Sequence, residues 1–403
     1  MVSMTVATTQ TLPTERIGLS KNRILDALAN RWRVVPVLLI LVLIWLLFSF
    51  MSPNFFSPRN LTNLSVQIVV TTVIGLGLLF VLLIGELDLA IVVTSAISAT
   101  VAATLATGGQ APLAVSVAGA VAVGTLIGLI QGAIVTVFKA PAFIVTLGFS
   151  IALQGVLFAV LPGSGTIPLV STSMAEVSTT YLSAAQGWLC GIVGVAIYAA
   201  MRFRSMRSRR KHGLAVSAAM TLLLPVAALA AATAATIAMM NAYRGVPLVI
   251  ALLLLLMCGL AFVTTQTRFG LYLFAIGANQ EAARRSGIPV GQVKIAAFGV
   301  AGAMAAIGGL MAASRLMAVS AASADTSLLL DAVAAIVIGG ASLFGGRGSV
   351  WSALIGALVM GSIANGMLLI NASTSVRLVV QGSILVVAVV LDATAARRSR
   401  SLR

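Results

Sequence analysis

Apolar runs of about 20 residues follow one another along almost the whole chain. An α-helix rises 1.5 Å per residue, so a run of this length crosses the roughly 30 Å hydrocarbon core of a bilayer. The sequence therefore predicts an all-α, polytopic integral membrane protein with about 12 transmembrane helices. The predicted spans are 34–52, 66–84, 89–107, 113–138, 142–161, 185–201, 214–240, 247–265, 293–313, 332–343, 351–370 and 378–391.

Charge is scarce inside these runs and concentrated at their edges. Hydrophobic residues make up 60% of the chain and charged residues 8%, where a soluble domain carries about 25% charged residues. With the N-terminus inside, 21 of the 25 basic residues fall on inner segments. Only Arg59, Arg244, Arg315 and Arg377 fall outside. By the positive-inside rule both termini are cytoplasmic, and the net charge of +16 reflects topology and not a nucleic-acid partner.

The same pattern divides the chain into three parts. Residues 1–33 are a cytoplasmic N-terminal segment, 34–392 the transmembrane domain and 393–403 a basic cytoplasmic tail. A secretory signal would have a shorter basic region, a shorter apolar core and a small-residue cleavage site, so the run 34–52 is predicted to be a retained first span. The lipid bilayer is the first partner that the sequence implies.

The sequence contains no recognisable catalytic motif. A phosphate-cradling loop needs Gly-Lys-Ser/Thr, and no lysine of this chain follows a glycine. Cys190 and Cys258 lie in separate apolar runs, which favours inert thiols over a disulfide. His212 lies in a basic stretch without the spacing of a metal site. We expect no catalytic, cofactor-binding or metal residues, and a chain that is not an enzyme and does not hydrolyse ATP.

A polar loop at residues 267–289 interrupts two apolar runs. Asn279 can cap a short helix over 280–286, and Gly287 can end it in the left-handed conformation. Pro289 then prevents the helix from restarting. The predicted two-turn helix carries Glu281, Ala282, Ala283, Arg284 and Arg285. An ordinary cytoplasmic loop is an equally good interpretation of these residues alone.

Two carboxylates border the second and third apolar runs, in Gly85-Glu86-Leu87-Asp88-Leu89. A charge at the centre of a membrane helix costs about 2.5–3.5 kcal/mol on insertion scales, so carboxylates here need a reason. Asp88 is predicted to be the N-cap of the next helix. Glu86 has no such local role, although it can face water. A proton relay through the pair stays open as an alternative.

A related acidic motif, Leu330-Asp331-Ala332, precedes Gly339-Gly340 and Gly345-Gly346. Asp331 repeats Asp88 in kind, as an inverted repeat would require, although the match is short enough for chance. We take Glu86, Asp88, Asp331, Gly339 and Gly340 as candidate translocation or gating residues. Inside the spans, amide side chains are interhelical hydrogen-bonding groups first and solute ligands second. They are Gln67, Gln131, Gln154, Asn365 and Gln381.

The longest outer loop, residues 162–183, is rich in serine, threonine and glycine and has a single charge, Glu176. Most such loops are connectors, and this is the interpretation that we favour. A surface that receives a soluble partner from outside is the alternative.

The residues now on the page resemble a known family. Glu281-Ala282-Ala283, three residues and then Gly287 resemble the EAA loop of ABC importer permeases, which docks into a groove on the ATPase. Further similar stretches run from about residue 60 to the C-terminus, and together they resemble the permease subunits of sugar ABC importers of the ribose/xylose group. They are Gly85-Glu86-Leu87-Asp88-Leu89, residues 142–148, residues 241–247 and residues 330–350. The additional pair of spans around residues 202–211 is similar to the xylose-type branch, whereas Ala90-Ile91-Val92-Val93 departs from the Ser-Val-Gly common in relatives.

The resemblance implies an importer of a neutral monosaccharide, with D-xylose first, in the bacterial inner membrane. It implies a permease homodimer, a cytoplasmic ATPase that uses ATP and Mg, and a periplasmic or lipid-anchored sugar-binding protein. Closure of the ATPase would push on the loop from Glu281 to Gly287 and tilt the helices. A proton-coupled secondary sugar transporter using Glu86 and Asp88 is the alternative, and a membrane scaffold or enzyme a distant third.

Overall fold

The computed structural model describes the chain from Val34 to Ser401, apart from residues 213–216. The predicted N-terminal segment 1–33 lies outside the described residues. The helices are α2 (Val34–Met51), α3 (Pro58–Leu83), α4 (Ile91–Gly108), α5 (Leu113–Val137), α6 (Ala142–Val160), α7 (Ser173–Thr179), α8 (Ala184–Lys211), α9 (Leu224–Asn241), α10 (Leu248–Gln266), α11 (Arg268–Ala278), α12 (Gln280–Arg285), α13 (Val290–Leu316), α14 (Thr326–Ile338), α15 (Val350–Leu369) and α16 (Thr374–Ser401). The short elements are β1 (Thr166–Pro168), β2 (Tyr181–Leu182), β3 (Val246–Pro247), β4 (Ala318–Ser320), a π-helical turn η1 (Ala219–Leu223) and a 3₁₀ turn η2 (Ala321–Ala324).

Every predicted span overlaps a helix, so the all-α membrane fold is confirmed. Within the described part of the chain, ten helices are long and apolar enough to cross a membrane. The first and last predicted spans correspond to the shorter apolar segments Val37–Met51 and Thr374–Val390. The total of twelve crossings and the sides of the termini stay predictions.

Several helix boundaries differ from the predicted ones, and α3 begins at Pro58, eight residues before its predicted limit. Helix α14 begins at Thr326, six residues before its predicted start. It ends at Ile338, five residues before its predicted end, because the Gly339-Gly340 pair stops it. Helix α8 does not end at 201 but continues through the basic stretch to Lys211. Arginine and lysine are good helix formers, and cations are favoured at a helix C-terminus. Helix α16 likewise continues through most of the predicted tail, to Ser401.

Helix α13 lies at the centre of the bundle against α3, α4 and α5. The contacts are backbone to backbone: a Cβ on Gly302 would lie 2.0 Å from the Gly124 oxygen, and one on Gly309 would lie 2.1 Å from the Ser95 oxygen. The small residues along 299–309 therefore form a close-packing face, as small residues do in membrane helices.

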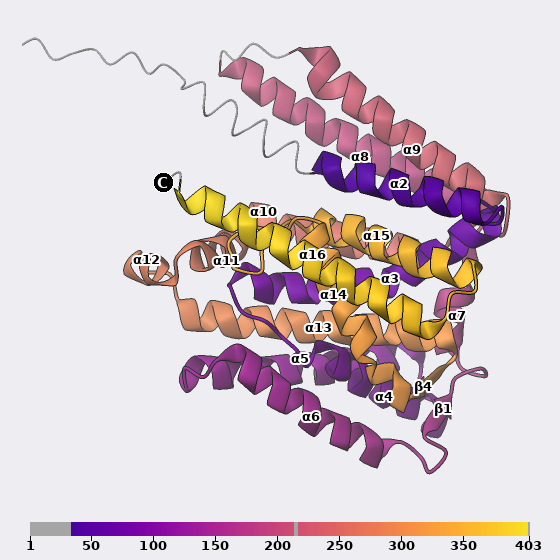
Figure 1. Cartoon of the computed structure of the whole chain (residues 1–403), viewed down its shortest axis with the longest axis vertical. Helices are drawn as coiled ribbons and strands as arrows, with labels where there is room; N and C mark the ends of the chain where they lie inside the picture. The colour runs from indigo at the N-terminus through magenta and orange to yellow at the C-terminus, as the bar shows by residue number, and fades with distance from the viewer. Residues whose placement is uncertain (1–33, 213–216, 402–403) are drawn as a thin grey trace, which may run out of the picture.

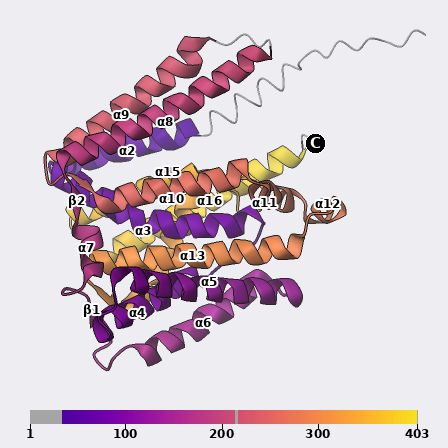
Figure 2. The same cartoon turned by 180° about the vertical axis from the view of Figure 1, so that it is seen from behind.

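The ends and sides of the bundle are distinct (Figures 1 and 2). Helices α2, α8 and α9 lie together along one side and α6 along the opposite side. Helix α2 begins, α8 ends and α12 lies at the same end of the bundle, where α16 also finishes. Strands β1 and β2 and helix α7 lie at the other end.

The predicted outer loop 162–183 is a small folded layer and not a plain connector. Strand β1 pairs antiparallel with β4, and β2 pairs antiparallel with β3. Between them, α7 packs against the last turns of α13, where the Ser178 N–H donates to the Ser314 hydroxyl at 2.9 Å. The residue types of the loop do not predict this layer, because the partners of both strands lie far along the chain.

Candidate functional site

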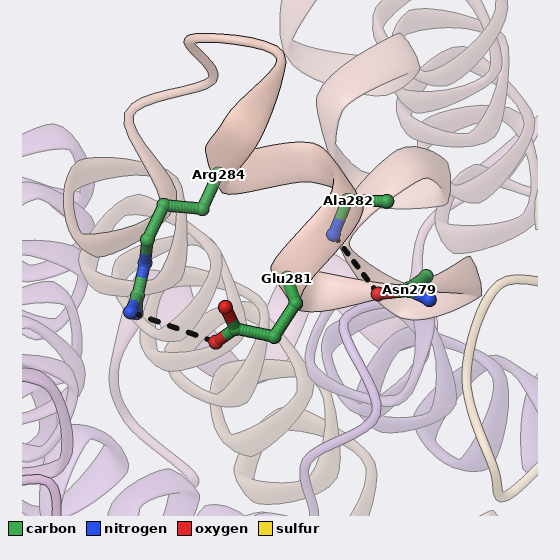
Figure 3. A network of polar contacts seen from close by, with 4 residues as sticks. All are labelled: Asn279, Glu281, Ala282 and Arg284. Carbon is green, nitrogen blue, oxygen red and sulfur yellow. Dashed lines mark hydrogen bonds and ion pairs between the residues drawn. The ribbon is translucent and has the colours of Figure 1, made fainter.

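The helix predicted over 280–286 exists as α12, Gln280–Arg285, and its N-terminus is capped as expected. The Asn279 side-chain oxygen accepts a hydrogen bond from the Ala282 N–H at 2.9 Å (Figure 3). Asn279 itself is extended, with φ −164° and ψ 105°. This conformation turns the chain sharply between α11 and α12, so that α12 points away from the bundle (Figure 1).

The C-terminus of α12 has the left-handed glycine that the sequence predicts. Gly287 has φ +81°, and its N–H donates to the Arg284 oxygen at 3.0 Å. The N–H of Ile288 donates to the Ala283 oxygen at 3.1 Å. These two bonds form a Schellman motif, which fixes the length of α12 at both ends. Pro289 does not simply keep a helix from restarting, because it is the N-cap residue from which α13 starts directly.

The surface of α12 is polar and open. Ala283 is its buried residue, at 4% exposure, while Glu281 and Arg284 form an exposed ion pair at 3.6 Å (Figure 3). An ion pair in water contributes little to stability, so these charges remain available to a partner. Arg285 is also exposed. A short, doubly capped helix with this surface is suited to docking into a complementary groove.

Beneath α12, three segments of the chain cross with their backbones in direct contact. We call this contact the glycine crossing, and its members are Gly85, Gly277, Gly345 and Gly346. Gly277 lies near the end of α11, Gly85 in the acid loop (residues 84–90) and the other two in the glycine loop (residues 339–349). A Cβ on Gly277 would lie 1.9 Å from the Leu83 oxygen, and one on Gly345 would lie 2.9 Å from the Cα of Gly85. The Gly346 N–H donates to the Leu83 oxygen at 3.0 Å. The base of α12 is thus tied to both loops.

The acid loop is also tied to the first turns of α13 by an ion pair. Lys294 Nζ contacts Glu86 Oε1, with side chains 10% and 22% exposed. Glu86 therefore does not simply face water, and sequence reasoning missed its partner because Lys294 lies 208 residues away. The available signal was that both residues fall on the same predicted side of the membrane.

Asp88 is not the N-cap of the next helix. Ala90 is the N-cap residue of α4, and the Asp88 carboxylate accepts a hydrogen bond from the Ala90 N–H at 2.9 Å, two residues along, before the helix begins. The side chain is 2% exposed. Burial raises the pKa of Asp88 to about 7, and the Ala90 hydrogen bond offsets part of that rise. The neighbouring Leu89 N–H donates to the Thr146 hydroxyl of α6 at 3.1 Å.

Asp331, Gly339 and Gly340 do not form one site with Glu86. Asp331 lies within α14, where its carboxylate accepts a hydrogen bond from Gln381 of α16 at 3.2 Å. Asp88, by contrast, lies outside any helix, so the two acidic motifs differ in local structure. Gly339 packs on α15, where its Cβ would lie 2.0 Å from a backbone oxygen. Gly340, with φ +99°, opens the glycine loop toward the crossing.

Amide side chains inside the spans divide into paired and unpaired groups. Asn60 and Asn365 exchange two hydrogen bonds, of 2.9 and 3.0 Å, which confirms interhelical hydrogen bonding for Asn365. Gln131 is 1% exposed, and among the described residues neither its amide oxygen nor its nitrogen has a partner. The hydroxyls of Thr94 and Ser98 on α4 are also buried, and they too have no hydrogen-bond partner among the described residues. Sequence reasoning missed Thr94 and Ser98.

Comparison with known proteins decides the family. The model of the "Branched-chain amino acid transport system / permease component" family matches residues 60–389. The chain belongs to this family of transport permeases. The permease is 36% identical to the xylose transport system permease protein XylH of Escherichia coli (strain K12), over 91% of this chain and 93% of that protein. It is 36% identical to XylH of Haemophilus influenzae over 84% of this chain and 90% of that protein, and 29% identical to the ribose import permease protein RbsC of Escherichia coli (strain K12) over 88% and 92%. No solved structure matches it.

The family and the apolar helices together place the permease as a multi-pass protein of the bacterial inner membrane. It is the membrane subunit of an ABC importer, a class that works with an ATPase and a substrate-binding protein. The family match, over residues 60–389, covers the acid loop, the glycine crossing and α12 alike.

Proposed function

We propose that the permease imports a neutral monosaccharide, with D-xylose as the first candidate and another neutral pentose or hexose as the second. The identity to proteins named for xylose transport exceeds that to proteins named for ribose import, over a similar share of the chain. The family description also covers amino-acid transport. A carboxylate substrate would need a cation free to receive it. Lys294, a buried cation on a membrane helix, is already paired with Glu86, which favours a neutral solute.

We infer that α12 is the docking element for the ATPase. The observation that carries this is its geometry: an exposed two-turn helix, capped by Asn279 and Gly287, that stands on the glycine crossing. Nothing packs over its polar face among the described residues, whereas its root is fixed to two loops. A load applied to α12 therefore reaches the acid loop, the glycine loop and α13 without passing through a flexible linker.

The remaining partners follow from the two ends of the bundle. Residues 202–211, α12 and Arg347 belong to the predicted inner side, where ATP and Mg are used by the ATPase and not by this chain. The layer of β1, α7 and β2 at the opposite end is where we expect the sugar-binding protein (Figures 1 and 2). An ATPase with two nucleotide-binding domains requires two copies of α12, so we expect a permease homodimer.

Reconstitution tests the proposal directly. The permease is placed in proteoliposomes with and without its ATPase subunit and binding protein, and uptake of labelled D-xylose is measured at micromolar concentration. We expect uptake only when all partners and ATP are present. Uptake driven by a proton gradient without an ATPase would instead support the secondary transporter that uses Glu86 and Asp88. Deletion of the gene with unchanged sugar uptake and lost uptake of a charged solute would overturn the neutral-sugar proposal.

A further inference from the structure

The cytoplasmic end of α8 carries an unusual concentration of positive charge. Residues 202–211 include six cations, and the whole sequence between Glu176 and Glu281 has no carboxylate side chain. Among the described residues, no salt bridge involves any of the six. At 28 residues α8 is about 42 Å long, so it extends past a hydrocarbon core of about 30 Å. The cations therefore lie at and just beyond the membrane surface.

An apolar groove runs between α8 and α9 directly beside these cations. A cavity of about 540 Å³ is lined by Ala199, Ala200 and Phe203 of α8 and by Leu222, Val226 and Ala227 across from them. Alanine at these facing positions leaves a gap between the two helices that larger side chains would fill. The groove continues as a second cavity of about 380 Å³ toward Trp188, and Ala199 lines both.

This hairpin lies outside the core. Only 6% of the residues in the apolar stretch of each of these two spans are buried. Both helices run along one side of the bundle (Figures 1 and 2). Every residue that lines the two cavities belongs to α8, η1 or α9, so the groove lies apart from the core of the bundle. An occupant of this groove must be apolar.

Arg202, the residue before Phe203 on α8, is held in place by Tyr198. The Arg202 Nε donates to the Tyr198 hydroxyl at 2.9 Å, and the guanidinium lies 5.3 Å from the centre of that ring. Phe203, the next residue, lines the cavity. Arg204 and Arg207 follow within two turns and are exposed. An apolar groove with arginines on the adjoining turns of the same helix fits a ligand with a hydrocarbon chain and an anionic head.

We propose that the hairpin of α8 and α9 is a binding site for one anionic glycerophospholipid, such as phosphatidylglycerol. One acyl chain occupies the groove past Ala199, and the phosphate contacts Arg202 and the cations that follow it. Basic residues near a membrane surface attract anionic lipids, and bidentate guanidinium groups match phosphate geometry. The positive-inside rule explains why cations face the cytoplasm, but it does not require an apolar groove beside them.

The test counts lipids bound to the full-length permease. The protein is purified from nanodiscs of phosphatidylcholine containing increasing fractions of phosphatidylglycerol, and native mass spectrometry reports the lipids retained. We expect one retained phosphatidylglycerol and a clear preference over phosphatidylcholine. Ala199→Phe, which fills the groove, should abolish retention. Ala228→Phe is the matched control, because Ala228 is exposed on α9 and lines neither cavity.

Charge is tested separately, which keeps the proposal falsifiable if the groove variant does not fold. The double variant Arg202→Gln/Arg204→Gln should lower the preference for phosphatidylglycerol by about fivefold for each cation removed. Arg268→Gln, an exposed arginine on α11, should leave it unchanged. Equal retention of the two lipids by the wild-type protein would overturn the proposal, as would equal losses in Arg268→Gln. Displacement of the lipid by soluble glycerol phosphate at comparable concentration would also overturn it, since that ligand cannot occupy the groove.

Discussion

Gly277→Ala is the most direct perturbation of the glycine crossing. The added Cβ would lie 1.9 Å from the Leu83 oxygen and 2.3 Å from the Gly346 nitrogen, where ordinary van der Waals contact begins at 3.4 Å. These two atoms are hydrogen-bonded to each other at 3.0 Å. Both belong to the backbone, so neither can rotate out of the way as a side chain can. The methyl group would therefore separate the end of α3, which leads into the acid loop, from the glycine loop, displace α11, or do both.

The magnitude follows from opposing contributions. Overpacking in a filled interior costs about 1–3 kcal/mol, and loss of a net hydrogen bond about 0.5–1.5 kcal/mol. Alanine in place of glycine near the end of α11 returns up to about 1 kcal/mol of helix propensity. The joined state is then weakened by roughly 1–3 kcal/mol, which is about a 5- to 150-fold change in the ratio of joined to separated states.

The assay compares substrate-stimulated ATP hydrolysis with sugar uptake in proteoliposomes that contain the ATPase. We expect the sugar transported per ATP to fall at least about fivefold in Gly277→Ala, because movement of α12 no longer reaches the two loops. Gly259→Ala is the matched control, since Gly259 lies in the adjacent helix α10 with nothing within 4 Å of an added Cβ. Wild-type coupling in a monodisperse, membrane-inserted Gly277→Ala protein would refute the role of the crossing.

Three further predictions concern the neighbouring residues. Gly287→Val should fray α12 and reduce ATPase coupling, because φ +81° strains a β-branched residue by about 1–2 kcal/mol. Gly287→Asn should retain the coupling, and transport per ATP measured for both variants checks this. Glu86→Ala should lower the unfolding midpoint in detergent, because it leaves Lys294 unpaired at a cost of about 2–4 kcal/mol. A Glu86→Ala/Lys294→Ala protein that is no more stable than the single variant would contradict the pairing. Burial raises the pKa of Asp88 from 3.8 to about 7, so the contribution of this carboxyl to stability is complete below pH 3.8 and is lost as the pH rises through about 7. Asp88→Asn should therefore flatten the pH dependence of the thermal unfolding midpoint across that interval.

The parts of the site that could be predicted from the sequence depend on neighbours a few residues apart. Asn279 caps a helix whose first N–H groups follow within three residues, and Gly287 ends it through bonds that reach back by five residues at most. The apolar runs are also local, which is why every predicted span overlaps a helix. Hydropathy marks where a chain leaves the membrane and not where its helix ends, so the prediction ended α8 about ten residues early.

The glycine crossing could not be predicted in the same way. Its members lie at positions 85, 277, 345 and 346, and each looks like a loop glycine or a helix glycine in its own context. What makes them a unit is the approach of three backbones, which depends on the packing of α3, α11 and α14. Asp88 is predictable only in part for the same reason. Its hydrogen bond from the Ala90 N–H is local, but the burial that raises its pKa comes from the whole bundle.

Helix α13 joins the two ends of the permease. Its first turns carry Lys294, paired with the acid loop, and its last turns carry Ser314, bonded to α7 at the opposite end of the bundle. Over its 27 residues, about 40 Å, it is held by contacts such as those of Gly302 and Gly309, where an added Cβ would lie close to 2 Å from another helix's backbone. Interiors packed this closely shift as bodies and do not bend by small local amounts. We therefore expect a push on α12 that reaches Pro289 to move α13 together with α4 and α5, and to reach the layer of β1, α7 and β2 through Ser314.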